Sequence, residues 1–252
     1  MTLLSEKELE KYSRQILIDK VGIKGQEEIK ASSVLLIGCG GLGTSAAQYL
    51  VMAGVGKIKI IDFDSVELTN LNRQTLFLEE DIGLKKTEAI AKRLKRINSA
   101  SEVITQTKKI QKHNINKYLK TYKIILDCTD NFKTRYLINK YCHKNKKILI
   151  SAALQSFDVQ AFAFSSWKNK KNPCYECIFP DIGQKINNSC DQLGIIAPIA
   201  GIGGVLQAIL TLNIILNNTK EIFQEFISLD CFSRNFRKIK VRKNSECKIC
   251  KR

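Results

Sequence analysis

The segment VLLIGCGGLG, residues 34–43, decides how this chain folds. It begins with the apolar run Val34–Ile37, whose length and side chains predict a buried strand. A glycine-rich turn leads from this run into Leu42–Ala53, a predicted helix, and its glycines are Gly38, Gly40, Gly41 and Gly43. Such a turn lets a phosphate approach the backbone N–H groups at the helix N-terminus, although a packing turn without a ligand is the alternative. The segment therefore favours a nucleotide-binding α/β fold.

Strand and helix patterns alternate after this segment, in the order expected of a parallel sheet. We predict further strands at Lys57–Asp62, Ile124–Cys128 and Lys147–Ala152, and helices at Leu84–Ile97 and Thr134–Lys144. In the C-terminal third, antiparallel strands are expected around a buried helix that begins near Pro198, at Val159–Ser165, Phe226–Cys231 and Phe236–Val241. The fold prediction is a Rossmann-like, mostly parallel α/β sheet, extended by antiparallel strands in the C-terminal third.

We expect one domain over residues 1–252, with a nucleotide-binding half at about 30–155 and a sheet extension at about 156–252. The chain is 44% hydrophobic and 26% charged, which excludes a disordered or collagen-like protein. Its 41 Lys+Arg against 24 Asp+Glu give a net charge of +17, but the excess is spread along the chain. We therefore expect no nucleic-acid ligand.

Residues 192–219 carry no charge and are long enough to cross a bilayer. Pro198 and several glycines in this stretch favour a buried core helix, so no membrane partner is expected. The polar N-terminus does not resemble a signal peptide. Nine cysteines then predict reduced thiols in the cytoplasm, some of them holding metal.

Polar side chains follow the predicted strands at the edge where open sheets bind ligands. Asp62 ends the second strand, where a carboxylate can accept hydrogen bonds from a ribose of either NAD or ATP. Lys86 lies at a helix start, where a cation is unfavourable unless a phosphate holds it. A third strand is followed by Asp130 and Asn131; either can cap the next helix. Because a carboxylate beside a phosphate needs a cation, we assign Asp130 to Mg²⁺.

A divalent metal and additional phosphate-binding cations favour nucleotidyl transfer from ATP over hydride transfer. The chain has only two histidines, and no Ser-His-Asp order is indicated. This scarcity of candidate general bases fits a carboxylate nucleophile, which is already ionised at neutral pH.

Two C-x-x-C pairs, Cys174 with Cys177 and Cys247 with Cys250, match a tetrahedral Zn²⁺ site with four thiolates. Four protein ligands leave no open coordination position, so the predicted role is structural. Redox chemistry and unrelated thiols are the alternatives. Cys190 lies instead in a polar segment and is a candidate nucleophile or sulfur-relay thiol.

Several short segments together resemble the ThiF/MoeB/HesA enzymes, bacterial relatives of the ubiquitin-activating enzymes. They are YSRQIL (12–17), GCGGLG (38–43), DFD (62–64), NLNRQ (70–74), DCTDN (127–131) and the two cysteine pairs. The resemblance implies ATP-dependent adenylylation of the C-terminal glycine carboxylate of a small ubiquitin-like sulfur carrier protein that ends in Gly-Gly. It also implies a homodimer. Because no rhodanese-like extension follows Arg252, we expect a separate sulfur donor protein.

The resemblance also implies roles for individual residues. Gly41 would lie at the phosphates and Asp62 at the ribose, within a nucleotide site that includes Asp64, Asn70, Arg73, Gln74, Lys86, Asp130 and Asn131. Arg14 would reach the γ-phosphate from the other subunit. Cys190 aligns with the cysteine that joins the carrier covalently in the thiamine branch, but other motifs favour the molybdopterin branch, so the carrier's pathway stays open. The alternatives are a tRNA-modifying dehydratase that uses ATP and a non-catalytic nucleotide-binding scaffold.

Overall fold

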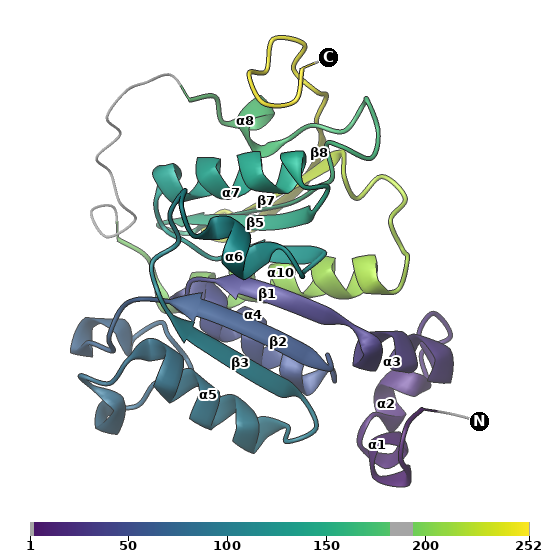
Figure 1. The fold of residues 1–252 in the computed structure, drawn as a ribbon, viewed down its shortest axis with the longest axis vertical. Coiled ribbons are helices and arrows are strands. Elements are labelled where there is room, and N and C mark those ends of the chain that lie inside the picture. Colours follow the sequence, from purple (N-terminus) through teal and green to yellow (C-terminus); the bar gives the residue numbers. More distant parts are fainter. Residues whose placement is uncertain (1–2, 182–193, 252) are drawn as a thin grey trace.

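A computed structural model describes residues 3–181 and 194–251. The described residues form an eight-stranded sheet in the order β3-β2-β1-β4-β5-β6-β7-β8 (Figure 1). The strands are β1 (Ser33–Ile37), β2 (Lys57–Asp62), β3 (Glu102–Thr107), β4 (Ile124–Asp127), β5 (Ile148–Gln155), β6 (Asp158–Phe164), β7 (Glu225–Asp230) and β8 (Asn235–Lys240). Pairing is parallel from β3 to β5 and antiparallel from β5 to β8. The predicted fold class is confirmed.

Helices cover both faces of the sheet (Figure 1). They are α1 (Glu6–Lys11), α2 (Ser13–Ile16), α3 (Gly22–Ala31), α4 (Gly41–Met52), α5 (Lys86–Ile97), α6 (Ile115–Leu119), α7 (Phe132–Lys144), α8 (Tyr175–Ile178) and α10 (Ala197–Ile215), with 3-10 turns η1 (Leu68–Asn70) and η2 (Glu79–Asp81). One core cluster packs Val34 and Leu36 of β1 against α4, α5 and α10. A second packs Leu35 and Ile37 against α6, α7 and α8. Burial on both faces explains why β1 is apolar throughout.

The uncharged helix α10 has the length and composition to cross a membrane. In the structure it lies against α4, β5 and β6. Glycines permit this close packing, because a Cβ on Gly204 would lie 2.4 Å from the Leu42 carbonyl oxygen. The helix begins at Ala197 with proline in its first turn, as the sequence predicts.

The ends of β1, β2 and β4 meet at one edge of the sheet. Ile37, the last residue of β1, pairs with Ile61 in β2 and with Asp127 in β4. The chain therefore leaves all three strands at the same level, and β1 lies where successive connections diverge to opposite sides. Open α/β sheets bind ligands in the crevice at such a point.

Candidate functional site

A cavity of about 730 Å³ opens at this edge of the sheet. Most of the predicted nucleotide-site residues line it, although they come from five separate segments: Gly38, Gly40, Gly41, Asp62, Asp64, Asn70, Arg73, Gln74, Lys86, Asp130 and Asn131. Gly43 and Arg14 do not line the cavity, and Cys190 lies outside the described residues.

Three glycines of the turn are required by close packing. Gly38 has φ +101°, in the left-handed region, and a Cβ there would lie 2.6 Å from the Cys128 carbonyl oxygen. A Cβ on Gly41 would lie 2.6 Å from the Ala200 Cβ, and one on Gly43 would lie 2.0 Å from the Gly38 carbonyl oxygen. Gly40 differs, because a Cβ there would meet nothing within 4 Å. Its missing side chain leaves the cavity open beside the turn.

The N-terminus of α4 faces this turn. Gly40 is the N-cap and supplies no side-chain cap, so the first backbone N–H groups of α4 receive no side-chain acceptor. Unpaired N–H groups and the positive end of the helix dipole together favour a bound anion. The turn can therefore hold a phosphate through its backbone alone.

Asp62 ties the glycine-rich turn to the end of β2. Its buried carboxylate accepts hydrogen bonds from the backbone N–H of Cys39 at 2.5 Å and of Asp64 at 2.7 Å. These bonds fix the carboxylate in the cavity wall, and each oxygen keeps lone-pair capacity for a hydroxyl donor.

Lys86 is the first residue of α5 and is buried. Its Nζ lies 3.7 Å from Asp64 Oδ2, so a carboxylate compensates the charge in this structure. Partial burial raises the pKa of the Asp64 carboxyl, and the negative charge of Asp62 raises it further, while Lys86 opposes the shift. The long contact leaves the ammonium free to turn toward a phosphate.

A second wall comes from η1 and the turn after it. Asn70 is buried, and its Oδ1 accepts from the Glu67 N–H at 3.3 Å. The Arg73 guanidinium donates to the Thr69 carbonyl at 2.8 Å. Gln74 Oε1 is buried without a hydrogen-bond partner among the described residues. A buried acceptor of this kind requires a donor, which a bound molecule can provide.

The competition between Asp130 and Asn131 for the helix cap is settled by geometry. Asn131 is the N-cap of α7, and its Oδ1 accepts from the Thr134 N–H at 3.0 Å. Asp130 is exposed, and its Oδ1 accepts a hydrogen bond from Asn131 Nδ2 at 3.2 Å. Its carboxylate is therefore available for a hydrated divalent cation.

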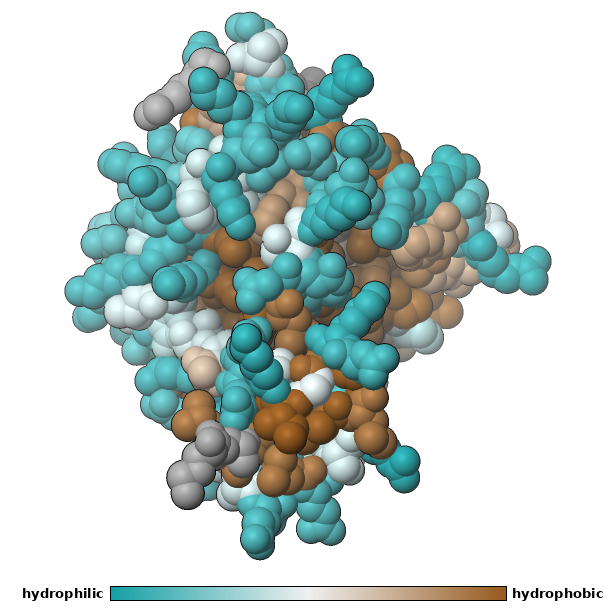
Figure 2. Space-filling model, turned by 90° about the vertical axis from the view of Figure 1, so that its right-hand side faces the viewer, coloured by the Kyte–Doolittle hydropathy of each residue, from teal (hydrophilic) through white to brown (hydrophobic). Residues whose placement is uncertain are grey.

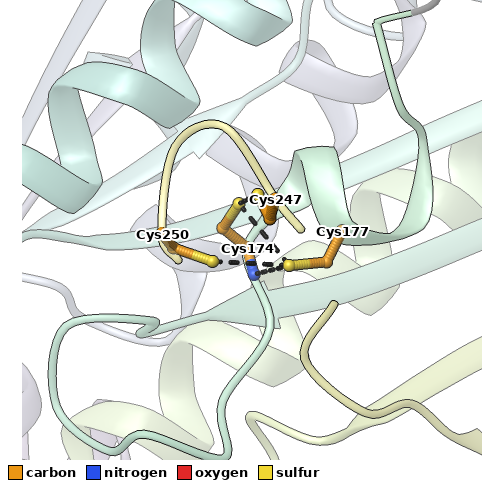
Figure 3. A group of neighbouring side chains, drawn as sticks. All are labelled: Cys174, Cys177, Cys247 and Cys250. Atoms are coloured by element: carbon orange, nitrogen blue, oxygen red, sulfur yellow. Dashed lines mark hydrogen bonds between the residues drawn. The ribbon is translucent and has the colours of Figure 1, made fainter. Parts of the chain in front are cut away.

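The two cysteine pairs come together although they lie far apart in the sequence (Figure 3). Their Sγ atoms all lie within 4.8 Å of one another. Contacts of 3.4 Å between Cys177 and Cys250 and 3.6 Å between Cys174 and Cys247 exclude disulfides between those partners. Four sulfurs about 2.3 Å from a central Zn²⁺ would be about 3.8 Å apart, so the cluster has the dimensions of a tetrahedral zinc site. Three of its four cysteines are buried, which argues against the exposed, reactive thiols that redox chemistry requires.

Some cavity residues escaped the sequence analysis. Arg135 of α7 lines the cavity although it is buried. Phe63 lies at the wall with Lys109, whose Nζ is 4.8 Å from the ring centroid. An aromatic between two aspartates at a strand end was a readable signal for Phe63. Arg135 and Lys109 gave no such signal in the sequence, because the chain is rich in lysine and arginine throughout.

Arg14 lies away from the cavity of its own chain. It is exposed on α2 and lines a groove of about 360 Å³ with Tyr49 and Met52 of α4 and Val205 and Ile209 of α10. Within one chain, therefore, Arg14 does not meet the other predicted nucleotide-site residues.

A ThiF family model matches residues 12–249. The adenylyltransferase and sulfurtransferase MOCS3 of Aedes aegypti is 38% identical over 250 residues, covering 98% of this chain and 56% of that protein. The chain thus spans about half the length of these relatives. The sulfur carrier protein adenylyltransferase of Thermus thermophilus is 34% identical over 249 residues, covering 98% and 92%. Among solved structures, E. coli MccB with ATP has a TM-score of 0.82 and 25% identity, covering 95% and 74%.

Proposed function

Because this chain belongs to the ThiF family, we propose that it uses ATP to adenylylate the C-terminal glycine of a small ubiquitin-like sulfur carrier protein. The observation that carries the proposal is the single cavity that gathers the glycine-rich turn, Asp62, Arg73, Lys86 and Asp130. The relative of nearly the same length is named a sulfur carrier protein adenylyltransferase. A related fold has been solved with ATP.

In this reaction a carboxylate oxygen of the terminal glycine attacks the α-phosphorus of ATP. The bond from that phosphorus to the oxygen bridging the β-phosphate breaks, and pyrophosphate leaves with the electron pair. The carrier keeps AMP as an acyl-adenylate. The attacking carboxylate is ionised at neutral pH and needs no base. This fits a cavity whose described lining residues include no histidine.

The cavity residues would then act by position and charge. The turn at Gly40 and Gly41 would bind phosphate through backbone N–H groups, and Asp62 would accept from the ribose hydroxyls. Arg73 and Lys86 would neutralise the triphosphate. Asp130 would hold Mg²⁺, which stabilises the charge that develops on the leaving pyrophosphate.

Pyrophosphate exchange into ATP tests this proposal. We expect exchange that requires a carrier ending in Gly-Gly, of the thiamine or the molybdopterin type. We expect Asp130→Ala to lower the exchange rate by about 10²-fold or more, because it removes a charge-stabilising group. Asp158→Ala is the matched control, since Asp158 is exposed on β6 outside the cavity.

Other outcomes identify the alternatives. Exchange that persists in Asp130→Ala would overturn the assignment of the metal ligand. ATP turnover that requires tRNA instead of a carrier would indicate the dehydratase. Tight binding of NAD without any exchange would contradict the proposed function altogether. Sulfur would reach the adenylate from a separate donor protein, so the exchange assay needs none.

We further propose that a second copy of the chain completes the site through Arg14. Figure 2 shows hydrophobic residues gathered on the side that carries the N-terminal helices, ringed by polar residues. Large side chains that line the Arg14 groove are exposed, with Met52 at 48%, Tyr49 at 47% and Ile209 at 47%. An apolar face of this kind is typical of a subunit interface.

Mixing two inactive variants tests this arrangement. If Arg14 acts across the interface, a heterodimer of Arg14→Ala and Asp130→Ala contains one intact site and one doubly defective site. Random exchange of subunits would then restore about a quarter of the wild-type exchange rate, because half of the dimers are mixed and each has one working site. Activity no higher than that of the separate variants would place Arg14 in its own chain's site or outside catalysis. Size-exclusion chromatography of each variant checks that the dimers form.

A further inference from the structure

Arg135 of α7 lines both the nucleotide cavity and a small cleft formed with residues of β5 and β6. It is 5% exposed. Its guanidinium donates to the Ala152 carbonyl at 2.8 Å, to Ser151 Oγ at 3.2 Å, and to the Thr129 carbonyl. Thr129 directly precedes Asp130, so one of these bonds holds the backbone that aims the proposed magnesium ligand.

The Thr129 backbone is also held by Asp127, the last residue of β4. Asp127 is fully buried and accepts from the Thr129 N–H at 3.0 Å and Oγ1 at 2.7 Å. Ser151 Oγ, which Arg135 contacts, lies 3.4 Å from Asp127 Oδ2. Thr129 is thus fixed between a buried carboxylate and a buried guanidinium, and charge-assisted bonds of this type are strong and directional.

The other side of Arg135 is connected to the cysteine cluster. Tyr175 directly follows Cys174 and lines the small cleft together with Arg135. Burial raises the pKa of the Tyr175 hydroxyl, and the positive charge of Arg135 opposes that shift, so the two groups lie close together. One turn further along α7, Asn139 accepts from the Tyr175 N–H at 3.0 Å, and its Nδ2 lies 3.6 Å from Cys174 Sγ. Residues four apart lie on one face of a helix. Helix α7 therefore contacts the first cysteine pair through Asn139 and begins at the Asp130 loop.

From these contacts we propose that Arg135 is a positioning residue, which holds Asp130 in place for magnesium and is itself packed beside Tyr175 in the cleft next to the cysteine cluster. The role rests on the proposed function, because it concerns the magnesium–nucleotide site. A lysine cannot replace the guanidinium, since it lacks the planar fork that reaches three acceptors at once. Groups that orient a metal ligand typically change metal affinity by about 10- to 100-fold when they are altered.

Nucleotide binding with and without Mg²⁺ tests the proposal by calorimetry on the full chain, with ATP as the probe. We expect Arg135→Lys to raise the Mg²⁺ concentration needed for half-maximal ATP binding about tenfold. ATP affinity in EDTA should stay unchanged. Tyr175→Phe removes only the hydroxyl and is expected to give a smaller shift in the same direction, with zinc content unchanged. In the double variant the two shifts should not add, because both variants act on the same guanidinium position.

Tyr141→Phe is the matched control. Tyr141 is a buried tyrosine of α7 whose hydroxyl bonds to Asn116, away from Asp130. If Arg135→Lys and Tyr175→Phe need no more Mg²⁺ than the wild type, the inference is wrong. It is also wrong if their ATP affinity falls as much in EDTA as it does with Mg²⁺, because the residues are then merely structural. If Arg135→Lys fails to fold, Tyr175→Phe decides alone. Failure of the wild type to bind ATP with Mg²⁺ would instead overturn the proposed function, which separates the two conclusions.

Discussion

Cys247→Ser is expected to abolish zinc binding and to lower the melting temperature by roughly 10–20 °C, the shift that corresponds to a loss of about 5 kcal/mol in a domain of this size. Structural zinc contributes on the order of 10 kcal/mol in zinc-finger peptides. A smaller net loss is expected here, because cysteines of the unfolded chain also bind the metal. That loss is still a large fraction of the usual stability of a folded protein.

The size of the effect follows from how little else holds the C-terminus. Strand β8 is exposed at the edge of the sheet, and residues 241–251 form no strand or helix. Cys247 and Cys250 lie in this segment and are buried, at 4% and 2% exposure. Without the metal, the four cysteines would form a sulfur cluster with no central ion.

Metal analysis and thermal unfolding of the same preparations check this prediction. Cys231→Ser is the control, because Cys231 is half-buried between β7 and β8 and does not belong to the cluster. It should retain zinc and melt close to the wild type. Wild-type protein without bound zinc, or Cys247→Ser with the wild-type zinc content, would contradict the assignment. A reversible two-electron oxidation of the cluster would support the redox alternative.

The sequence predicted the elements whose signals are local. Val34–Ile37 is apolar throughout because both faces of β1 are covered, and such a run is easy to recognise. The glycine-rich turn was equally clear, since close packing excludes side chains at three of its positions. Strand β3 was not predicted because it is an edge strand in which four of the six residues are polar, EVITQT, without the alternation of a half-buried strand, and it pairs only with β2 among the described residues.

Site residues that follow strand ends could be predicted from the sequence. Where two neighbouring residues could serve the same role, only the geometry of the folded chain selects one. Both Asp130 and Asn131 could cap α7, and only the backbone conformation at Asn131 selects one. Arg135 has the sequence signature of any surface cation, and its burial depends on strands that follow it in the chain. The roles of Arg14, Cys190 and the nucleotide residues, and the division near residue 155, stay predictions.

Gly43→Ala is expected to weaken nucleotide binding by about 10²-fold, because the new methyl group would collide with the turn itself. Its Cβ would lie 2.0 Å from the Gly38 carbonyl oxygen and 2.9 Å from the Gly38 carbon. Backbone atoms cannot rotate away as a side chain can, so the glycine-rich turn must shift. Overpacking costs about 1–3 kcal/mol. A displacement of about 1 Å at a binding turn can lower activity by about 10²-fold.

Glycine-to-alanine variants at two other positions distinguish the effect of the steric clash from the effect of losing a glycine. Gly40→Ala meets no atom within 4 Å, so it should fold normally and weaken ATP binding only by filling space beside the turn. Gly201→Ala also has open space and lies inside α10, where alanine should stabilise the helix by about 0.5–1 kcal/mol without altering ATP binding. Thermal unfolding and ATP titration of the three variants give both quantities. Because Gly43 does not line the cavity, loss of binding in a Gly43→Ala variant that still unfolds cooperatively would arise through the turn, and wild-type binding by that variant would mean that the turn does not hold the phosphates.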